Sequence, residues 1–150
     1  MPGTSVGLPV PLLAGQLSQD RIDRVICLVP DEEALDRSPA YYGAMVRGEL
    51  GVDVERLPVK DWAVPDDPDA FLALAEDVAG RLRLGERMLV HCAGGCGRTG
   101  TFCACVLVML GASPEEAIAA FRAARGCGPE TAAQAAFVAV AAERGPAVGD

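Results

Sequence analysis

The chain has 150 residues, and its 21 acidic against 13 basic side chains give a formal net charge of −8. This length suits one domain with its own core, so we expect residues 1–150 to form one. The acidic balance disfavours nucleic acid and anionic membranes as partners, because both repel negative charge. The single histidine, His91, excludes metal sites that need two imidazoles.

The cysteines and the chain start bear on location. Six cysteines in a chain of this length favour a reducing compartment, since disulfide scaffolds are typical of smaller secreted proteins. Residues 1–15 contain three prolines and lack Lys and Arg, so they do not resemble an export signal. The longest apolar run, Phe102–Leu110, spans nine residues, and a membrane helix needs about 20. We therefore expect a cytoplasmic protein.

The first half of the chain alternates between strand and helix patterns. Residues 1–19 show no clear pattern. Arg24–Val29 is rich in β-branched residues and predicts a buried strand, whereas Pro39–Leu50 has proline in its first turn and predicts a helix. Val52–Leu57 predicts a second strand. Pro58–Asp69 holds three prolines and four aspartates without an apolar period and predicts a loop.

The second half continues the alternation. Asp69 is expected to cap a helix that runs through Arg83, and Arg87–His91 predicts a strand apolar enough to be central in a sheet. Three helices are then predicted, at Thr99–Leu110, Ser113–Arg125 and Glu130–Arg144. Strands that alternate with helices predict an α/β fold with a central, mostly parallel sheet flanked by helices.

One segment between a predicted strand and a predicted helix carries chemistry. Residues 91–100 read His-Cys-Ala-Gly-Gly-Cys-Gly-Arg-Thr-Gly. A glycine-rich turn into a helix lets successive backbone amides point inward and bind an anion. Arg98 offers a planar fork for two phosphate oxygens. The pKa of Cys92 should be lowered there, which makes it a thiolate nucleophile that the Thr99 hydroxyl can stabilise.

Residues 91–100 resemble the signature His-Cys-x-x-Gly-x-Gly-Arg-Ser/Thr-Gly of the cysteine-dependent protein tyrosine and dual-specificity phosphatases. The resemblance spans roughly Arg24 to Val138 and is greatest to the small phosphatases related to the cyclin-dependent-kinase-associated phosphatase. It implies that family's fold in a single phosphatase domain. It also implies hydrolysis of phosphotyrosine and/or phosphoserine/threonine through a cysteinyl phosphate, without a metal or other cofactor. The residues expected to bind phosphate are Ala93, Gly94, Gly95, Cys96, Gly97 and Arg98.

The resemblance implies roles outside this loop as well. Asp61 matches the general acid that protonates the leaving oxygen, and Asp66 is the alternative. Gln134 matches a glutamine that helps to place the hydrolytic water. His91 neighbours Cys92 at a strand end, so its side chain should point to the opposite face and support the loop from behind.

The remaining cysteines have several readings. Cys96 is either a neutral filler or a partner that protects an oxidised Cys92 as a disulfide, and Cys27 is another candidate partner. Cys27, Cys103 and Cys105 lie on apolar elements and are expected in the core. Cys127 is a turn residue without an assigned role.

The substrate prediction depends on the variable loop positions. Ala93, Gly94 and Cys96 are uncharged, whereas related phosphoinositide phosphatases have lysines there, so a phosphorylated protein or peptide is favoured over a lipid. Tyr41 and Tyr42 are candidates for a pocket wall. Two other functions stay open: a thiol-dependent redox enzyme resembling arsenate reductases, and an inactive phosphopeptide-binding module. The oligomeric state is not determined by the sequence.

Overall fold

Three strands and seven helices follow one another in the computed structural model, which describes Met1 and residues 9–146. They are α1 Val10–Gln19, β1 Arg24–Cys27, α2 Asp31–Arg37, α3 Pro39–Val46, β2 Asp53–Arg56, α4 Pro68–Arg83, β3 Met88–His91, α5 Gly97–Met109, α6 Pro114–Arg125 and α7 Ala132–Arg144. The predicted α/β class and all three predicted strands are confirmed. None of the described helices is both long and apolar enough to cross a membrane.

The sheet is parallel throughout, with the strand order β2-β1-β3. Val25 of β1 is in register with Val54 of β2 and with Leu89 of β3. The prediction that Arg87–His91 is the central strand is wrong. Among the described residues β1 is central and β3 lies at an edge. The apolar character of β3 comes instead from its packing against the core, because helices cover both faces of a parallel sheet.

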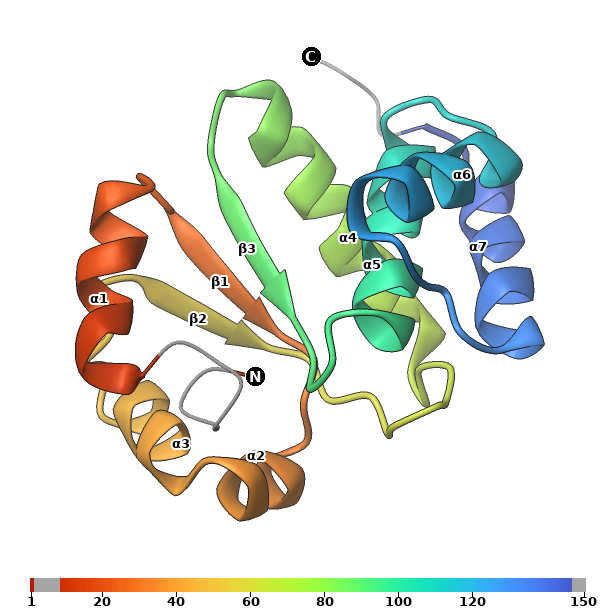
Figure 1. Cartoon of the computed structure of the whole chain (residues 1–150). Coiled ribbons are helices and arrows are strands. Elements are labelled where there is room, and N and C mark those ends of the chain that lie inside the picture. Colours follow the sequence, from red (N-terminus) through yellow and green to blue (C-terminus); the bar gives the residue numbers. More distant parts are fainter. Residues whose placement is uncertain (2–8, 147–150) are drawn as a thin grey trace.

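Helices lie on both sides of the sheet. In Figure 1, α1, α2 and α3 lie on one side, and α4 to α7 gather on the other. Helix α5 is the most buried, with eleven of its thirteen residues in the interior. Its Phe102 meets Phe71 edge to face at 5.2 Å between ring centroids, and Phe71 contacts Phe137 at 5.5 Å. A buried phenyl group contributes about 1.5–3 kcal/mol, so this cluster holds α5 firmly in place.

Two helices were not predicted, and several boundaries differ from the prediction. Helix α1 falls within the N-terminal residues that showed no pattern, and α2 has only seven residues, too few to show a helical period. Helix α4 is capped by Asp67, whose carboxylate accepts a hydrogen bond from Ala70 N at 3.0 Å. The prediction of Asp69 as the cap is wrong, because Pro68 already occupies the first turn of the helix.

The carboxyl ends of the three strands converge at one edge of the sheet (Figure 1). Backbone hydrogen bonds continue past the strands there, from Leu28 N to His91 O and from Val59 N to Leu28 O, both at 3.0 Å. The start of α2, the loop after β2 and the loop after β3 all leave this edge. Ligands of parallel α/β sheets bind outside the carboxyl ends of the strands, so the fold brings these three segments to one candidate site.

Candidate active site

The loop of residues 92–98, here called the P-loop, curves around the Cys92 thiol between β3 and α5. Cys92 is 3% exposed, and Gly95 N donates a hydrogen bond to its Sγ at 3.2 Å. Helix α5 begins at Gly97, within the loop. The positive end of the helix therefore lies beside the sulfur, where it favours an anion.

The surroundings of Cys92 favour its thiolate. Burial raises the pKa of Cys92, but the hydrogen bonds from the Thr99 side chain and backbone and from Gly95 N, together with the charge of Arg98, lower it below its ordinary value of 9.0. The buried Thr99 hydroxyl has no hydrogen-bond partner of its own, and its proximity to Cys92 helps to lower the pKa of that thiol. In contrast, burial raises the pKa of Cys27 to about 11. The nucleophilic form is thus favoured at Cys92.

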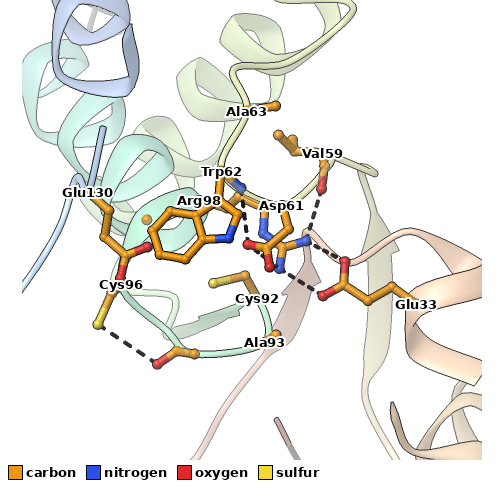
Figure 2. A network of polar contacts seen from close by, with 12 residues as sticks. Glu33, Val59, Asp61, Trp62, Ala63, Cys92, Ala93, Cys96, Arg98 and Glu130 are labelled. Atoms are coloured by element: carbon orange, nitrogen blue, oxygen red, sulfur yellow. Dashed lines mark hydrogen bonds and ion pairs between the residues drawn. The ribbon is translucent and has the colours of Figure 1, made fainter. Parts of the chain in front are cut away.

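Arg98 is buried, and two of the three nitrogens of its guanidinium have protein partners (Figure 2). The Glu33 carboxylate accepts from Nη1 at 2.8 Å and from Nη2 at 2.9 Å. Nη1 also donates to Val59 O at 3.0 Å, and Nη2 lies 3.2 Å from Asp61 Oδ1. The Nε atom is buried without a partner. An unpaired buried donor lowers the stability of a protein by about 1–3 kcal/mol. Nε is therefore available to donate a hydrogen bond to a bound ligand.

Glu33 is a site residue that the sequence analysis missed. Its hydrogen bond to Arg98 is the main cause that lowers the pKa of its carboxyl group. Glu33 Oε1 also accepts from Arg37 Nε at 3.0 Å. A signal was present, because Glu33 lies four residues after the end of the first predicted strand, and parallel strands end at one edge of the sheet. A carboxylate at that edge is a natural partner for a buried arginine.

The acid loop, defined as residues 57–67, connects β2 to α4 and holds both candidate acids. Asp61 is 42% exposed at its side chain and points toward Arg98 (Figure 2). Its Oδ1 also accepts from Trp62 N at 3.0 Å. Asp66 Oδ2 lies 3.9 Å from Lys60 Nζ, and its side chain is 80% exposed. The structure therefore brings Asp61, and not Asp66, to the P-loop arginine.

His91 lies behind the P-loop, on the face expected from strand alternation. Its Nδ1 is 3.0 Å from Cys92 O, which can only accept, so Nδ1 carries the hydrogen. Nε2 then accepts from the Tyr41 hydroxyl at 2.6 Å. Burial lowers the pKa of His91. Tyr41 is only 1% exposed, so its prediction as a pocket wall is wrong, because its hydroxyl satisfies the buried imidazole. Tyr42 is half-buried against the core.

Gln134 is completely buried, and its amide connects three segments. Oε1 accepts from Glu130 N at 3.0 Å and from Thr131 N at 3.1 Å, which completes the cap of α7. Nε2 donates to Ala63 O of the acid loop at 3.1 Å. A Cβ atom at Gly97 would lie only 3.1 Å from Oε1, so the amide also packs on the P-loop. Its role in placing a water stays a prediction.

Cys96 forms a disulfide with Cys127. Of the two readings of Cys96, a neutral filler or a partner of an oxidised Cys92, the structure shows neither, because Cys96 is bonded to Cys127 while Cys92 and Cys27 are both free thiols. A disulfide between Cys27 and an oxidised Cys92 stays a prediction. Spacing along the chain could not reveal the observed pair, because Cys127 lies in a turn 31 residues downstream that only the packing of α6 and α7 brings onto the P-loop. Cys105 is buried as predicted, whereas Cys103 is half-buried.

The fold and the P-loop together define a class: α/β domains in which a cysteine lies at the centre of an anion-binding loop that opens a helix. Within the described part of the chain, no group of three or more His, Cys, Asp or Glu side chains could hold a metal ion. The chain belongs to the family described as the Swiss Army Knife protein, DSP-PTPase phosphatase domain, whose profile matches residues 14–144.

Several known proteins resemble this chain in sequence or in structure. The chain is 33% identical over 82 residues to cyclin-dependent kinase inhibitor 3 of Rattus norvegicus, a match that covers 53% of this chain and 38% of that protein. The active form of Tk-PTP superposes with a TM-score of 0.74 at 29% identity, covering 91% of this chain and 88% of that one.

Two further structures show the same fold. A kinase associated phosphatase with its catalytic cysteine changed to serine has a TM-score of 0.79 at 24% identity, covering 92% and 80% of the two chains. PTPMT1 in complex with PI(5)P has a TM-score of 0.74 at 24% identity, covering 91% and 87%.

Proposed function

We propose that this protein is a metal-independent phosphatase that hydrolyses phosphotyrosine and/or phosphoserine/threonine in proteins or peptides. The observation that supports this best is the buried Arg98 Nε without a partner, beside a cysteine whose pKa is lowered. A hydrogen-bond donor beside a nucleophile suits a phosphate monoester, whose oxygens accept from Arg98 while its phosphorus lies against the Cys92 sulfur.

Phosphate binding would also release the acid. Nη1 of Arg98 donates both of its hydrogens, one to Glu33 and one to Val59 O. Nη2 donates one hydrogen to Glu33, and its other hydrogen faces Asp61. A phosphate that takes Nε and this Nη2 hydrogen forms the bidentate contact that arginine favours. Asp61 then leaves Arg98 and contacts the leaving oxygen of the ester, while Glu33 keeps the guanidinium in place.

The reaction proceeds in two steps. The Cys92 sulfur forms a bond to phosphorus as the ester P–O bond breaks, and Asp61 gives its proton to the departing oxygen. Asp61 then takes a proton from water, whose oxygen attacks phosphorus and breaks the S–P bond. Arg98 and the P-loop amides stabilise the charge on the equatorial oxygens in both steps.

The site suits a phosphate that stands alone. Arg98 is the only cation in the P-loop, and Ala93, Gly94 and Cys96 carry no charge to bind further phosphates. Trp62, next to Asp61, is 62% exposed and offers an aromatic surface beside the acid. We also propose a cytoplasmic location, supported by four free cysteines, because thiols persist in a reducing compartment.

Hydrolysis of a phosphotyrosine peptide tests the proposal. Cys92→Ser should abolish activity. Asp61→Asn should lower kcat by about 100-fold or more, the usual contribution of a general acid. A peptide is preferred to nitrophenyl phosphate, whose leaving group departs readily without a proton. Asp66→Asn should retain activity, and a loss there instead would assign the acid role to Asp66.

The same assay separates the alternatives. Activity that survives Cys92→Ser would refute the mechanism. A thiol-dependent redox enzyme would turn over only with added reductant and would ignore Asp61→Asn. An inactive binding module would bind the phosphopeptide without releasing phosphate. Vesicles that contain a monophosphorylated phosphoinositide complete the panel, and their preferred hydrolysis would contradict the protein or peptide substrate.

A further inference from the structure

The connection between α6 and α7, residues 126–131, packs directly on the end of the P-loop. Gly128 adopts a φ of +77°, and a Cβ atom there would collide with Cys96 O. Only glycine allows this approach. Arg122 holds the same connection to α6 by donating to Gly128 O at 3.1 Å and to Pro129 O at 3.2 Å. The connection is therefore a fixed support for the P-loop.

Arg125, the last residue of α6, binds the outer side of the P-loop. Its Nε donates to Gly95 O at 3.2 Å, and its Nη2 donates to Gly94 O at 3.3 Å. When the amides of an anion-binding loop point inward, its carbonyl oxygens point outward. Gly95 has a φ of +76° and follows another glycine, so these peptide planes rotate easily. A rotated carbonyl would face the bound phosphate, and Arg125 opposes that rotation.

The Cys96–Cys127 disulfide fixes the same contact covalently. Cys96 is the residue that precedes α5, and Cys127 lies in the 126–131 connection. Both residues are only half-buried, so a small dithiol can reach the bond. Figure 2 shows Cys96 on the P-loop together with Cys92. Disulfides inside cells are usually transient and redox-responsive, which suits a bond that touches a catalytic loop.

We propose that Arg125 and the Cys96–Cys127 disulfide form a brace that holds the P-loop in its phosphate-accepting conformation, so that phosphate affinity depends on redox state. Reduction transfers two electrons and two protons from a dithiol, breaks the S–S bond and leaves the Cys96 and Cys127 thiols, while the dithiol becomes a disulfide. Arg125 acts through the loop carbonyls as a positioning residue. This inference rests on the proposed function, because it concerns the same phosphate site.

Phosphate binding to Cys92→Ser protein tests the brace, since this background removes the redox chemistry of the nucleophile. Calorimetry with inorganic phosphate gives the Kd of the oxidised protein and of the protein reduced by dithiothreitol, and intact mass confirms each state. Reduction should weaken binding about fivefold or more, the lower range for coupled sites. With Cys96→Ser and Cys127→Ser added, the weaker Kd should appear in both conditions.

Arg125→Met should weaken phosphate binding similarly in the oxidised protein at an unchanged Tm, and Arg125→Lys should restore part of the loss. Arg47→Met is the matched control, because this exposed arginine pairs with Glu49 away from the P-loop. In otherwise wild-type protein, Arg125→Met should raise KM more than it lowers kcat.

Equal affinity in the oxidised and reduced proteins would refute the redox role, and so would failure of the disulfide to form in air. An unchanged Kd in Arg125→Met would refute the positioning role. Absence of phosphate binding in every protein, the oxidised parent included, would contradict the proposed function itself and the brace with it.

Discussion

Thr99 and Cys92 are the residues whose side chains decide the reactivity of the site. The Cys92 sulfur is buried, which by itself would favour the neutral thiol. The hydrogen bonds of Thr99 and Gly95 and the charge of Arg98 reverse that preference. The balance of these opposing contributions makes the thiolate sensitive to the loss of any one donor.

Thr99→Val should raise the pKa of Cys92. A hydrogen bond to a charged group contributes about 1.5–3 kcal/mol, which corresponds to about 1–2 pKa units. The rate of alkylation by iodoacetamide, followed against pH, should shift to higher pH by that amount. Thr101→Val is the matched control, because its hydroxyl donates to Gly97 O at 2.8 Å and not to the sulfur. An unshifted profile in Thr99→Val would remove Thr99 from the stabilisation of the thiolate.

His91 should make the stability of the fold depend on pH. Burial lowers its pKa below the ordinary 6.5 in the folded state, so the unfolded chain binds the proton more readily. His91 should therefore contribute its whole share to the free energy of unfolding above about pH 6.5. That contribution should be lost as the pH falls through the folded pKa. Urea unfolding at about pH 7.5 and about pH 5.5 measures this loss, which is about 1.4 kcal/mol per unit of pKa shift at most.

His91 is the only histidine, so its NMR ring signals report the folded pKa directly. A folded pKa at or above 6.5 would contradict the predicted direction. In Tyr41→Phe the imidazole Nε2 loses its donor and remains the only ring nitrogen that can accept a proton. Comparison of the two titrations therefore isolates the effect of the tyrosine hydroxyl on His91.

At the scale of elements, the N-terminus of α7 is joined to the acid loop through one side chain. Gln134 satisfies the amides of Glu130 and Thr131 and also the carbonyl of Ala63. Asp61 lies two residues before Ala63, so the position of the proposed acid depends on a helix more than seventy residues away in the sequence. Helix α7 thus contributes to the site without supplying a reacting group.

Gln134→Leu should destabilise the protein and slow its reaction. Unpaired buried amides and carbonyls cost about 1–3 kcal/mol, and a loosened acid loop should lower kcat on a phosphotyrosine peptide. Ser113→Ala is the control, because it removes the corresponding cap of α6 at a cost of about 1 kcal/mol. Both variants should unfold at lower urea concentration, but only Gln134→Leu should lose kcat. Equal kcat values would show that the link to Ala63 does not position the acid.

For the whole molecule, the net charge and the site have opposite signs. The protein carries a formal charge of −8, whereas the P-loop concentrates Arg98 and the positive end of α5 at one point. Long-range repulsion should therefore act on the substrate even though local contacts attract its phosphate. Salt separates these effects, since it screens the distant charges more strongly than the buried ones.

Peptides with acidic residues around the phosphotyrosine should be poor substrates at low ionic strength. An increase in ionic strength from about 0.01 to about 0.1 M shortens the Debye length from about 30 to about 10 Å. Over this range kcat/KM should rise for a phosphotyrosine peptide with acidic flanking residues relative to one of the same length with neutral flanking residues. Parallel salt responses for the two peptides would show that the net charge does not influence substrate choice.

The sequence alone determined the alternation of strands and helices, the P-loop with Cys92 and Arg98, and the position of Asp61 in a loop. These features are local, because turn residues, caps and hydrophobic spacing act over a few neighbouring residues. The class of fold followed from the same local patterns. The short helix α2 and the N-terminal helix α1 were missed because too few of their residues form a periodic pattern.

The tertiary structure alone decided which distant groups meet. It placed Glu33 on Arg98, Tyr41 on His91, Gln134 on Ala63 and Cys127 on Cys96, pairs that lie between 31 and 71 residues apart. It also placed β1 rather than β3 at the centre of the sheet. Such pairings depend on how the elements pack, and packing is a property of the complete core rather than of any short segment.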